Sequence, residues 1–256
     1  MIKAFKCDKL EKIIEAEKIN ECYECSKVNL ECNIIPEYVE YLKEQLNSEK
    51  NNELSVTKLL YCPRRTFLEK VIDYTISIHE MYENWRGTLI HKILQESKQE
   101  NCLIEQKFTR KYKDIEVIGT IDKLDIKNKT LYDYKTMTGK IDDDRTLRWG
   151  NPHLQHQIQL NLYKWLLEDK FEVENLVIVY IGSDKIMKFK IDIRTPDNKR
   201  KYTEIEKAFS RLEELSKCWN LSYKEAKEKN LIPKAEKDWI CKYCRFVKEC
   251  NEMERR

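Results

Sequence analysis

Two aspartates and a lysine stand close together near the middle of the chain, at Asp122, Asp133 and Lys135. Side chains two residues apart in a β-strand point to the same face, about 7 Å apart along the strand, so Asp133 and Lys135 would project together. Two carboxylates on one face repel each other unless a cation lies between them, and oxygen ligands suit Mg²⁺ or Mn²⁺. Such an ion polarises a phosphodiester and activates water, while an ammonium group offsets charge on the phosphate. For a D-x-K triplet taken alone, a surface strand with alternating charges is the alternative interpretation.

Strand patterns surround these residues and would position them. Segments 103–108, 115–122 and 130–136 are rich in β-branched and aromatic residues, and the polar run 126–130 supplies a turn. The last two segments are therefore predicted to form a hairpin that brings Asp122 beside Asp133. A second hairpin is predicted over 175–193, where apolar residues and lysines alternate.

Helices are predicted before, between and after the strands. Pro63 suits the first turn of a helix, and apolar periodicity marks further helices over 87–100, 153–169 and a long stretch that Asp197 could cap. The predicted apolar faces comprise Leu89, Ile90, Ile93 and Leu94 in one helix and Tyr202, Ile205, Phe209 and Leu212 in another. This order of elements predicts an α/β fold with a mixed β-sheet flanked by helices.

The overall charge excludes some classes of protein. The 256 residues carry 48 basic and 45 acidic side chains, a net charge of +3, which is not typical of a strongly basic nucleic-acid coat. A nucleic-acid partner would therefore need a local concentration of positive charge. No apolar run approaches the roughly 20 residues that span a bilayer, and the N-terminus lacks an apolar signal core. A cytoplasmic protein without a membrane partner is expected.

Ten cysteines suggest metal binding, because clustered cysteines in a reducing compartment more often hold metal than form disulfides. Cys241-x-x-Cys244 with Cys250 supplies three thiolates close in sequence, a spacing that suits zinc or an iron–sulfur cluster. Cys62 is the natural fourth ligand. Four ordinary buried thiols are the alternative.

A second cysteine group lies near the N-terminus. Cys22-x-x-Cys25 followed by Cys32 echoes the C-terminal spacing, and Cys7 would complete a set of four. A small zinc knuckle is the preferred interpretation, with a second cluster or no metal as alternatives. Residues 1–50 are predicted as a cysteine-rich appendage and residues 51–256 as the main domain.

Two further motifs flank the acids. Gly87-x-x-x-His91 lies upstream and offers a nitrogen ligand, and Gln159-x-x-x-Tyr163 lies downstream with a spacing that stacks two side chains on one helix face. Alone, each residue has a plainer interpretation: a helix histidine, a solvated polar face and a core aromatic. Glu105, on the strand before the hairpin, is a candidate for an acid that supports the ligands.

The ordered set of motifs resembles the RecB-family nucleases of the PD-(D/E)XK superfamily. The resemblance implies a restriction-endonuclease-like core and a metal-dependent deoxyribonuclease. It implies that Mg²⁺ or Mn²⁺ is bound by His91, Asp122, Asp133 and the main-chain carbonyl of Tyr134. It also implies that Lys135 is catalytic and that Gln159 and Tyr163 act near the substrate strand.

The cysteines extend the resemblance. One early and three late cysteines (Cys62, Cys241, Cys244 and Cys250) are similar to the set that holds an iron–sulfur cluster, most often 4Fe-4S, in nucleases of this family, with zinc as the alternative. The small size and the Cys62-Pro-Arg-Arg sequence look most like the CRISPR-associated RecB-like exonucleases. The resemblance implies cleavage at single-stranded or frayed DNA ends during spacer acquisition, with CRISPR integrase proteins as partners.

Two other functions stay open. The chain could be a DNA-end-binding or integrase-partner module with little turnover, or a repair nuclease that works with a separate helicase, because no phosphate-binding loop of a motor is present. Candidate DNA contacts are Arg64, Arg65, Arg148 and Trp149, from the phosphate affinity of arginine and the stacking capacity of the indole. A solvated charge or a core ring is the alternative for each.

Overall fold

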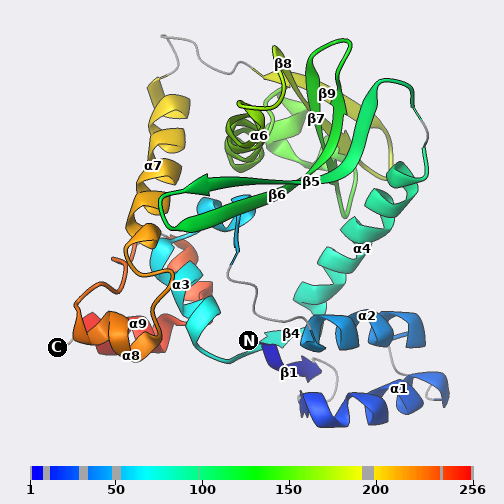
Figure 1. Ribbon diagram of the computed structural model, residues 1–256. Helices are drawn as coiled ribbons and strands as arrows, with labels where there is room; N and C mark the ends of the chain where they lie inside the picture. Colours follow the sequence, from blue (N-terminus) through cyan, green and yellow to red (C-terminus); the bar gives the residue numbers. More distant parts are fainter. Residues whose placement is uncertain are drawn as a thin grey trace. The chain divides into compact units, whose positions relative to one another are not determined.

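The computed structural model describes residues 2–7, 12–28, 34–47, 53–97, 99–191, 199–236 and 239–254. The chain forms two compact units (Figure 1). Unit 1 comprises residues 1–51, 64–88 and 221–256, and unit 2 comprises residues 52–63 and 89–220. This grouping differs from the predicted division at residues 50 and 51, because the N-terminal segment shares a unit with two later segments.

A six-stranded mixed sheet is the centre of unit 2. Its strands are β3 (Leu54–Ser55), β5 (Cys102–Tyr112), β6 (Ile115–Asp125), β7 (Thr130–Thr136), β8 (Asn175–Ile181) and β9 (Ile186–Ile191). The order is β3-β6-β7-β8-β9, with β5 paired to β6. Neighbours β6 and β7 are antiparallel, β7 and β8 parallel, and β8 and β9 antiparallel. The predicted mixed sheet and both predicted hairpins are confirmed.

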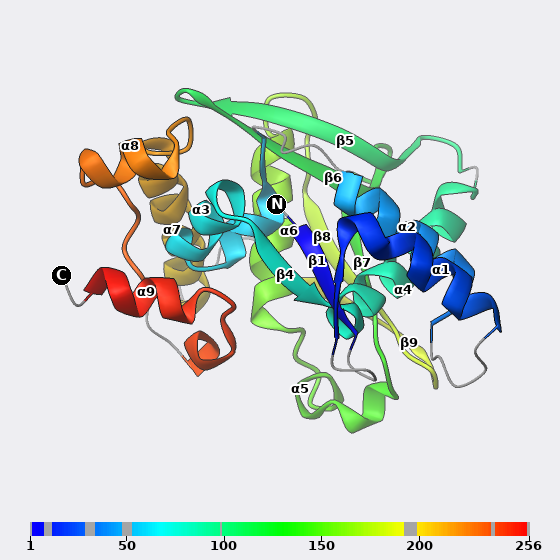
Figure 2. The same cartoon turned by 90° about the horizontal axis from the view of Figure 1, so that it is seen from below.

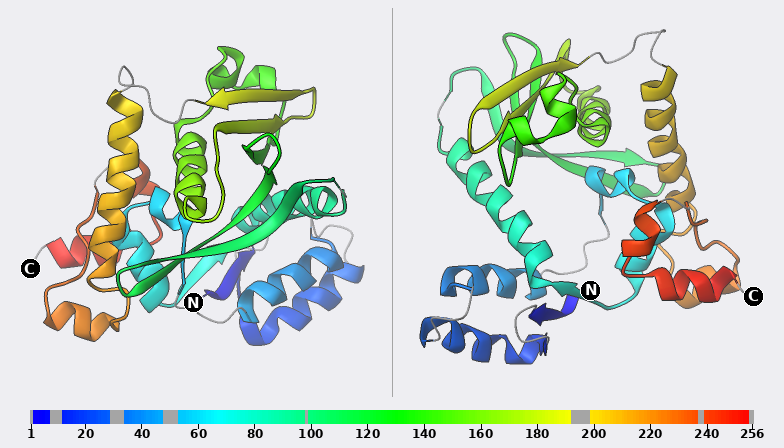
Figure 3. Two further views of the ribbon diagram at one scale, coloured as in Figure 1. Left: turned by 45° about the horizontal axis from the view of Figure 1, so that its top comes forward. Right: turned by 180° about the vertical axis from the view of Figure 1, so that it is seen from behind.

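Helix α6 (Leu154–Leu167) covers one face of this sheet. The other helical segments of unit 2 are the end of α4 (Ile78–Gln95), η2 (Val56–Leu60), η3 (Ile141–Asp143), α5 (Arg145–Arg148) and α7 (Lys199–Ser216). Helix α6 packs on β5, β6, β7 and β8, and α7 lies beside α6 (Figure 3). The rings of Trp165 and Phe209 meet at 5.4 Å in this helix pair. The predicted cap Asp197 and the side chain of Tyr202 lie outside the described residues.

The face of the sheet that carries Leu176, Ile178 and Tyr180 in β8 is fully buried. On the opposite face of β8, Val177 is half-buried and Val179 is buried. The Tyr180 hydroxyl accepts a hydrogen bond from the main-chain N–H of His153 at 3.0 Å, so this buried face looks toward the start of α6. Burying an aliphatic or aromatic side chain is worth about 1.5–3 kcal/mol, so this face supplies much of the core energy of unit 2.

Close packing of α6 depends on Gly119 in β6. A Cβ atom built on Gly119 would lie 2.6 Å from Tyr163 Cε1 and 3.0 Å from Leu166 Cδ2. Because neither approach is tolerable, any larger residue at position 119 requires α6 to move. Gly119, three residues before Asp122, therefore sets how closely Tyr163 approaches the sheet.

Unit 1 is built around a three-stranded sheet of order β2-β1-β4, formed by β1 (Ile2–Cys7), β2 (Lys12–Glu15) and β4 (Tyr74–Ser77). Its helices are η1 (Ala16–Lys18), α1 (Ile19–Val28), α2 (Pro36–Asn47), α3 (Pro63–Val71), the start of α4, α8 (Tyr223–Glu228), η4 (Trp239–Tyr243) and α9 (Val247–Glu254). Helices α1 and α2 lie side by side (Figure 2). Helix α2 contributes Tyr38, Val39 and Leu42 to the core of unit 1.

Helix α4 corrects another expectation. It begins at Ile78, nine residues before the predicted start, and ends at Gln95. Leu89 and Ile93, placed on its predicted apolar face, are 41% and 64% exposed. Residues two apart on a helix are separated by about 200°, so His91 points away from both. Within the described ranges, the helices are all too short or too polar to span a bilayer.

Candidate active site

Asp122 and Asp133 lie side by side on neighbouring strands. Lys123 pairs with Tyr132 in the antiparallel β6–β7 ladder. Asp122 and Asp133 adjoin this pair, one on each strand, so both point to the face opposite Lys123 and Tyr132. Both are buried, with 7% and 1% of their surface exposed. Asp122 Oδ2 accepts a hydrogen bond from the main-chain N–H of Tyr134 at 2.5 Å. The two carboxylates therefore share one buried site on the α6 side of the sheet.

Burial makes these two acids costly to ionise. It raises the pKa of Asp122 to about 7, and the charge of Asp133 adds to the rise. Burial also raises the pKa of Asp133, against the opposing effect of the Lys135 ammonium. A divalent cation between the carboxylates would remove much of this cost, because it favours both charged forms.

Lys135 projects beside Asp133. Its Nζ lies 2.9 Å from Oδ1 and 2.8 Å from Oδ2 of that carboxylate, and 19% of its side chain is exposed. The two-residue spacing in β7 puts both groups on one face, as the alternation of a strand requires. The ammonium can thus reach a group that enters from solvent while it remains paired with a buried acid.

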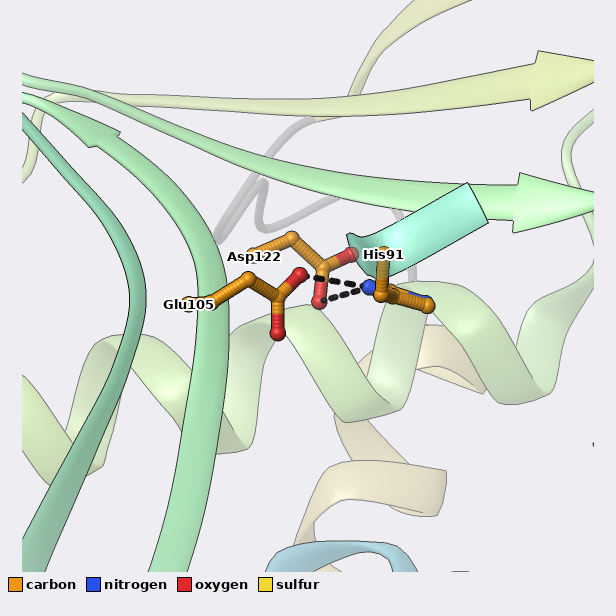
Figure 4. A group of neighbouring side chains, drawn as sticks. All are labelled: His91, Glu105 and Asp122. Carbon is orange, nitrogen blue, oxygen red and sulfur yellow. Dashed lines mark hydrogen bonds and ion pairs between the residues drawn. The ribbon is translucent and has the colours of Figure 1, made fainter. Parts of the chain in front are cut away.

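His91 and Glu105 close the other side of the site (Figure 4). His91 Nδ1 donates to Glu105 Oε1 at 2.6 Å and lies 3.6 Å from Asp122 Oδ1. The hydrogen bond to Glu105 raises the pKa of His91. One ligand atom from each of the three residues lies within 4.8 Å of the others. A divalent ion bound by these atoms would take the place of the proton on Nδ1.

Glu105 adopts an unusual backbone conformation. Its φ is 48°, in the left-handed region, between the paired residues Ile104–Lys123 and Gln106–Ile121. For a residue other than glycine this conformation costs on the order of 1–3 kcal/mol and persists where the surroundings enforce it. It turns the carboxylate toward His91 instead of leaving the residue in the ladder. The sequence offered no sign of this turn, since Glu105 reads as an ordinary strand acid.

Gln159 and Tyr163 contact each other on the buried face of α6. Gln159 Nε2 donates to the Tyr163 hydroxyl at 3.1 Å, and each residue is 7% exposed. Burial raises the pKa of Tyr163, and the charges of Asp133 and Asp122 add to the rise. The four-residue spacing therefore places a neutral phenol and an amide beside the acids.

His153 and His156 form a second polar network at the start of α6, where the His153 side chain is 36% exposed. His156 Nδ1 lies 2.8 Å from the Tyr180 hydroxyl, and His153 Nε2 lies 2.9 Å from Asp144 Oδ2. Burial and the Lys135 charge lower the pKa of His156 to about 3. A neutral His156 accepts the Tyr180 proton, which fixes the phenol that pairs across strands with Lys135.

Comparison with known proteins identifies the family. The model of the PD-(D/E)XK nuclease superfamily matches residues 98–251, more than half of the chain. The chain belongs to the PD-(D/E)XK nuclease superfamily. The crystal structure of SSO0001 is similar in fold, with a TM-score of 0.52 and 22% sequence identity over 83% of this chain and 93% of that chain. The comparison with curated proteins finds no match to this chain.

Membership in the PD-(D/E)XK nuclease superfamily implies a metal-dependent nuclease that acts on DNA and uses Mg²⁺ or Mn²⁺. The described residues fit such an ion. Two buried carboxylates, an adjacent glutamate and an imidazole are hard or borderline donors of the kind these ions accept. Burial and the charge of Asp133 raise the pKa of Asp122 although Lys135 and His91 act against the rise, so a further positive charge at this point would favour the ionised carboxylate.

The four cysteines of the predicted iron–sulfur cluster are placed in separate units. Cys241, Cys244 and Cys250 belong to unit 1, and Cys62 belongs to unit 2. The main-chain N–H of Cys244 donates to the Cys241 carbonyl at 3.1 Å, so a turn draws these two residues together. The cluster remains a prediction, as does the zinc site, for which Cys32 lies outside the described residues while Cys7 is buried in the core of unit 1.

The candidate DNA contacts differ in their availability. In unit 1, Arg64 Nε donates to the Pro233 carbonyl at 2.7 Å and Arg65 pairs with Glu69 at 3.0 Å. In unit 2, Arg148 is exposed and the Trp149 indole is 61% exposed, with the Arg145 guanidinium 4.4 Å from its ring centroid. Trp149 is therefore the better placed of these side chains for stacking on an unpaired base.

Proposed function

We propose that this protein is a Mg²⁺- or Mn²⁺-dependent exonuclease that hydrolyses phosphodiester bonds at single-stranded or frayed DNA ends. The observation that carries the proposal is the buried pair of Asp122 and Asp133 with the Lys135 ammonium in contact. The superfamily supplies the reaction class and the DNA substrate. The preference for ends is supported by the resemblance of the ordered motifs to RecB-family nucleases.

The residues divide the chemistry among them. His91, Asp122, Asp133 and the Tyr134 carbonyl would hold the ion, which when bound polarises the phosphodiester and lowers the pKa of water. Lys135 keeps positive charge beside the site, where it offsets the charge that develops on the phosphate. Before the ion binds, Glu105 accepts from His91 Nδ1 and so orients the ring, and with the ion bound its carboxylate would lie beside the same metal. Gln159 and Tyr163 keep the floor of the site neutral and hydrogen-bonded.

Linear and circular single strands test the preference for ends. With Mn²⁺ or Mg²⁺, an end-labelled linear strand should be shortened, whereas a circular strand of the same composition should persist. Cleavage of the circle at the rate of the linear strand would show an endonuclease instead. Binding of both substrates without cleavage of either would favour a DNA-binding module.

A role in CRISPR spacer acquisition is the finer proposal, supported by the cysteine set and the Cys62-Pro-Arg-Arg sequence. Trimming of integration substrates requires removal of single-stranded overhangs from a duplex. The same assay with a duplex that carries overhangs should therefore yield products trimmed to the junction, and addition of integrase proteins should protect the duplex. Continued digestion into the duplex would indicate a different role.

Cys62, Cys241, Cys244 and Cys250 are proposed to bind a 4Fe-4S cluster. Anaerobically purified protein should contain iron and acid-labile sulfide, and Cys62→Ala or Cys241→Ala should lose both. Cys102→Ala, on β5 and outside this set, is the matched control and should retain them. Zinc without sulfide would support the zinc alternative. Zinc that remains in Cys241→Ala and is lost in Cys22→Ala would support the N-terminal knuckle.

A further inference from the structure

The face of the catalytic sheet turned away from α6 carries lysines and tyrosines. Alternation along the strands puts Asp133 and Lys135 on the α6 side and Tyr132 and Tyr134 on the other. We call this other surface the rear face and define it by Lys123, Tyr132, Tyr134, Lys188 and Lys190. Lys188 and Lys190 are exposed, and Lys123, Tyr132 and Tyr134 are half-buried.

The register arranges these residues in two rows across the strands. Lys123 pairs with Tyr132, Tyr132 with Val177, and Val177 with Lys190, which makes a row across β6, β7, β8 and β9. The row beside it runs from Tyr134 through the buried Val179 to Lys188, so the exposed part of this row lies at its β9 end. Strands lie about 4.8 Å apart, so the lysines at the two ends of the first row are roughly 14 Å apart with a tyrosine between them.

One acid lies at the β6 end of the rear face, where the charge of Lys123 contributes to the lowered pKa of Asp125, but in the described part of the chain no acid pairs with the exposed lysines of β9. Elsewhere in unit 2, surface lysines pair with carboxylates, as Lys107 does with Glu53 and Lys129 with Glu174. Among the residues that the structure describes, Lys188 and Lys190 form no ion pair, and Lys123 Nζ donates to the Gln99 amide oxygen at 2.6 Å. Lys123 Nζ also lies 4.9 Å from the Tyr132 ring centroid. Positive charge is therefore concentrated here although the chain is almost neutral.

This combination fits a single nucleic-acid strand. Lysines on an open surface attract phosphates, and half-exposed tyrosine rings on a sheet stack on unpaired bases. Base pairs in a duplex are already stacked and offer the rings nothing comparable. An acidic polypeptide could use the lysines but gains little from rings arranged between them.

We propose that the rear face binds single-stranded DNA, as an additional site for the part of the substrate strand that lies beyond the cleaved end. The proposal rests on the proposed function for the identity of the nucleic acid. It predicts that affinity rises with strand length once the strand is long enough to pass around the edge of the sheet at β9. It also predicts that this gain depends on residues that do not contact the reacting phosphate.

Paired charge reversals test the site. The double variant Lys188→Glu with Lys190→Glu should bind a thymidine strand of about 30 nucleotides at least tenfold more weakly than wild type, by fluorescence anisotropy. Binding of a strand of about 6 nucleotides, and its cleavage, should be unchanged. Because each phosphate contact on a single strand contributes about 0.7 to the salt slope, the loss of two contacts should lower that slope by about 1.4.

The control is the double variant Lys111→Glu with Lys217→Glu, exposed lysines of the same unit, which changes the net charge equally. Equal weakening in both double variants would mean a general charge effect and would overturn the proposal. A second variant, Tyr132→Leu, should weaken the long strand by roughly tenfold through lost stacking. No effect of Tyr132→Leu, or equal displacement of the long strand by polyaspartate, would show a polyanion surface and also overturn it. If the wild-type protein does not cleave the short strand, the proposed nuclease function is contradicted, whereas the binding measurements still test the rear face.

Discussion

Alanine in place of Lys135 should lower the single-turnover rate of DNA cleavage by about 10²–10³-fold, the usual cost of removing one preorganised charge or donor from a transition state. The reason is geometric. The Lys135 ammonium touches both oxygens of Asp133 and is still partly exposed, so it is the positive group that a phosphate in this site would meet. Cleavage at saturating Mn²⁺, with product resolved by length, measures the effect.

The matched control is Lys107→Ala, a lysine of strand β5 in the same sheet whose partner is Glu53 on the surface. It removes the same side chain from the same sheet and should cut at the wild-type rate. Manganese binding should persist in Lys135→Ala, because the carboxylates and the imidazole are intact. Cleavage by Lys135→Ala within threefold of wild type would remove this lysine from the mechanism.

Asparagine in place of Asp122 should abolish cleavage and, with a chelator present, stabilise the fold above pH 7. The folded pKa of Asp122, about 7, is raised above its ordinary value of 3.8. A raised acid pKa means that the folded state holds its proton more tightly, so wild-type stability falls as the pH rises from about 4 to 7 and stays low above 7. The difference is worth a few kcal/mol at most, at about 1.4 kcal/mol per pKa unit. Asparagine carries no charge and escapes this loss.

Thermal unfolding in EDTA between pH 5 and pH 8 measures the prediction. Asp122→Asn and wild type should unfold at similar temperatures at pH 5 and diverge as the pH rises, and Mg²⁺ should close the gap by stabilising wild type alone. Asp125→Asn is the control of opposite sign, because hydrogen bonds from Asn128 lower the pKa of Asp125 and its charge therefore stabilises the fold. Equal pH profiles for wild type and Asp122→Asn would contradict the electrostatic description of the site.

The local geometry of the site was predictable where strand alternation decides it. The two-residue spacing of Asp133 and Lys135, with a turn before them, fixed their shared face and the strand that would lie beside them. The Gln159–Tyr163 contact likewise follows from helical spacing. These features depend on neighbours within a few residues or on a single hairpin.

Long-range contacts decided what could not be predicted. The left-handed conformation of Glu105 accompanies a contact with His91, which comes from the preceding helix α4. The buried state of His156 depends on Tyr180 from another strand. Leu89 and Ile93 were predicted to be buried but are exposed, because the apolar periodicity of a helix does not reveal whether another element packs against that face.

The turn between β6 and β7 limits which insertions and deletions the coding sequence can accept. It is held by the Asn128 N–H on Asp125 Oδ1 at 2.9 Å and by the left-handed backbone of Lys129, with φ 48°. Slipping β7 by one residue against β6 would send Tyr132 and Tyr134 inward and carry Asp133 and Lys135 to the other surface. Insertions or deletions of a single codon that shift this register would therefore separate the acids and leave a sheet without a reactive centre.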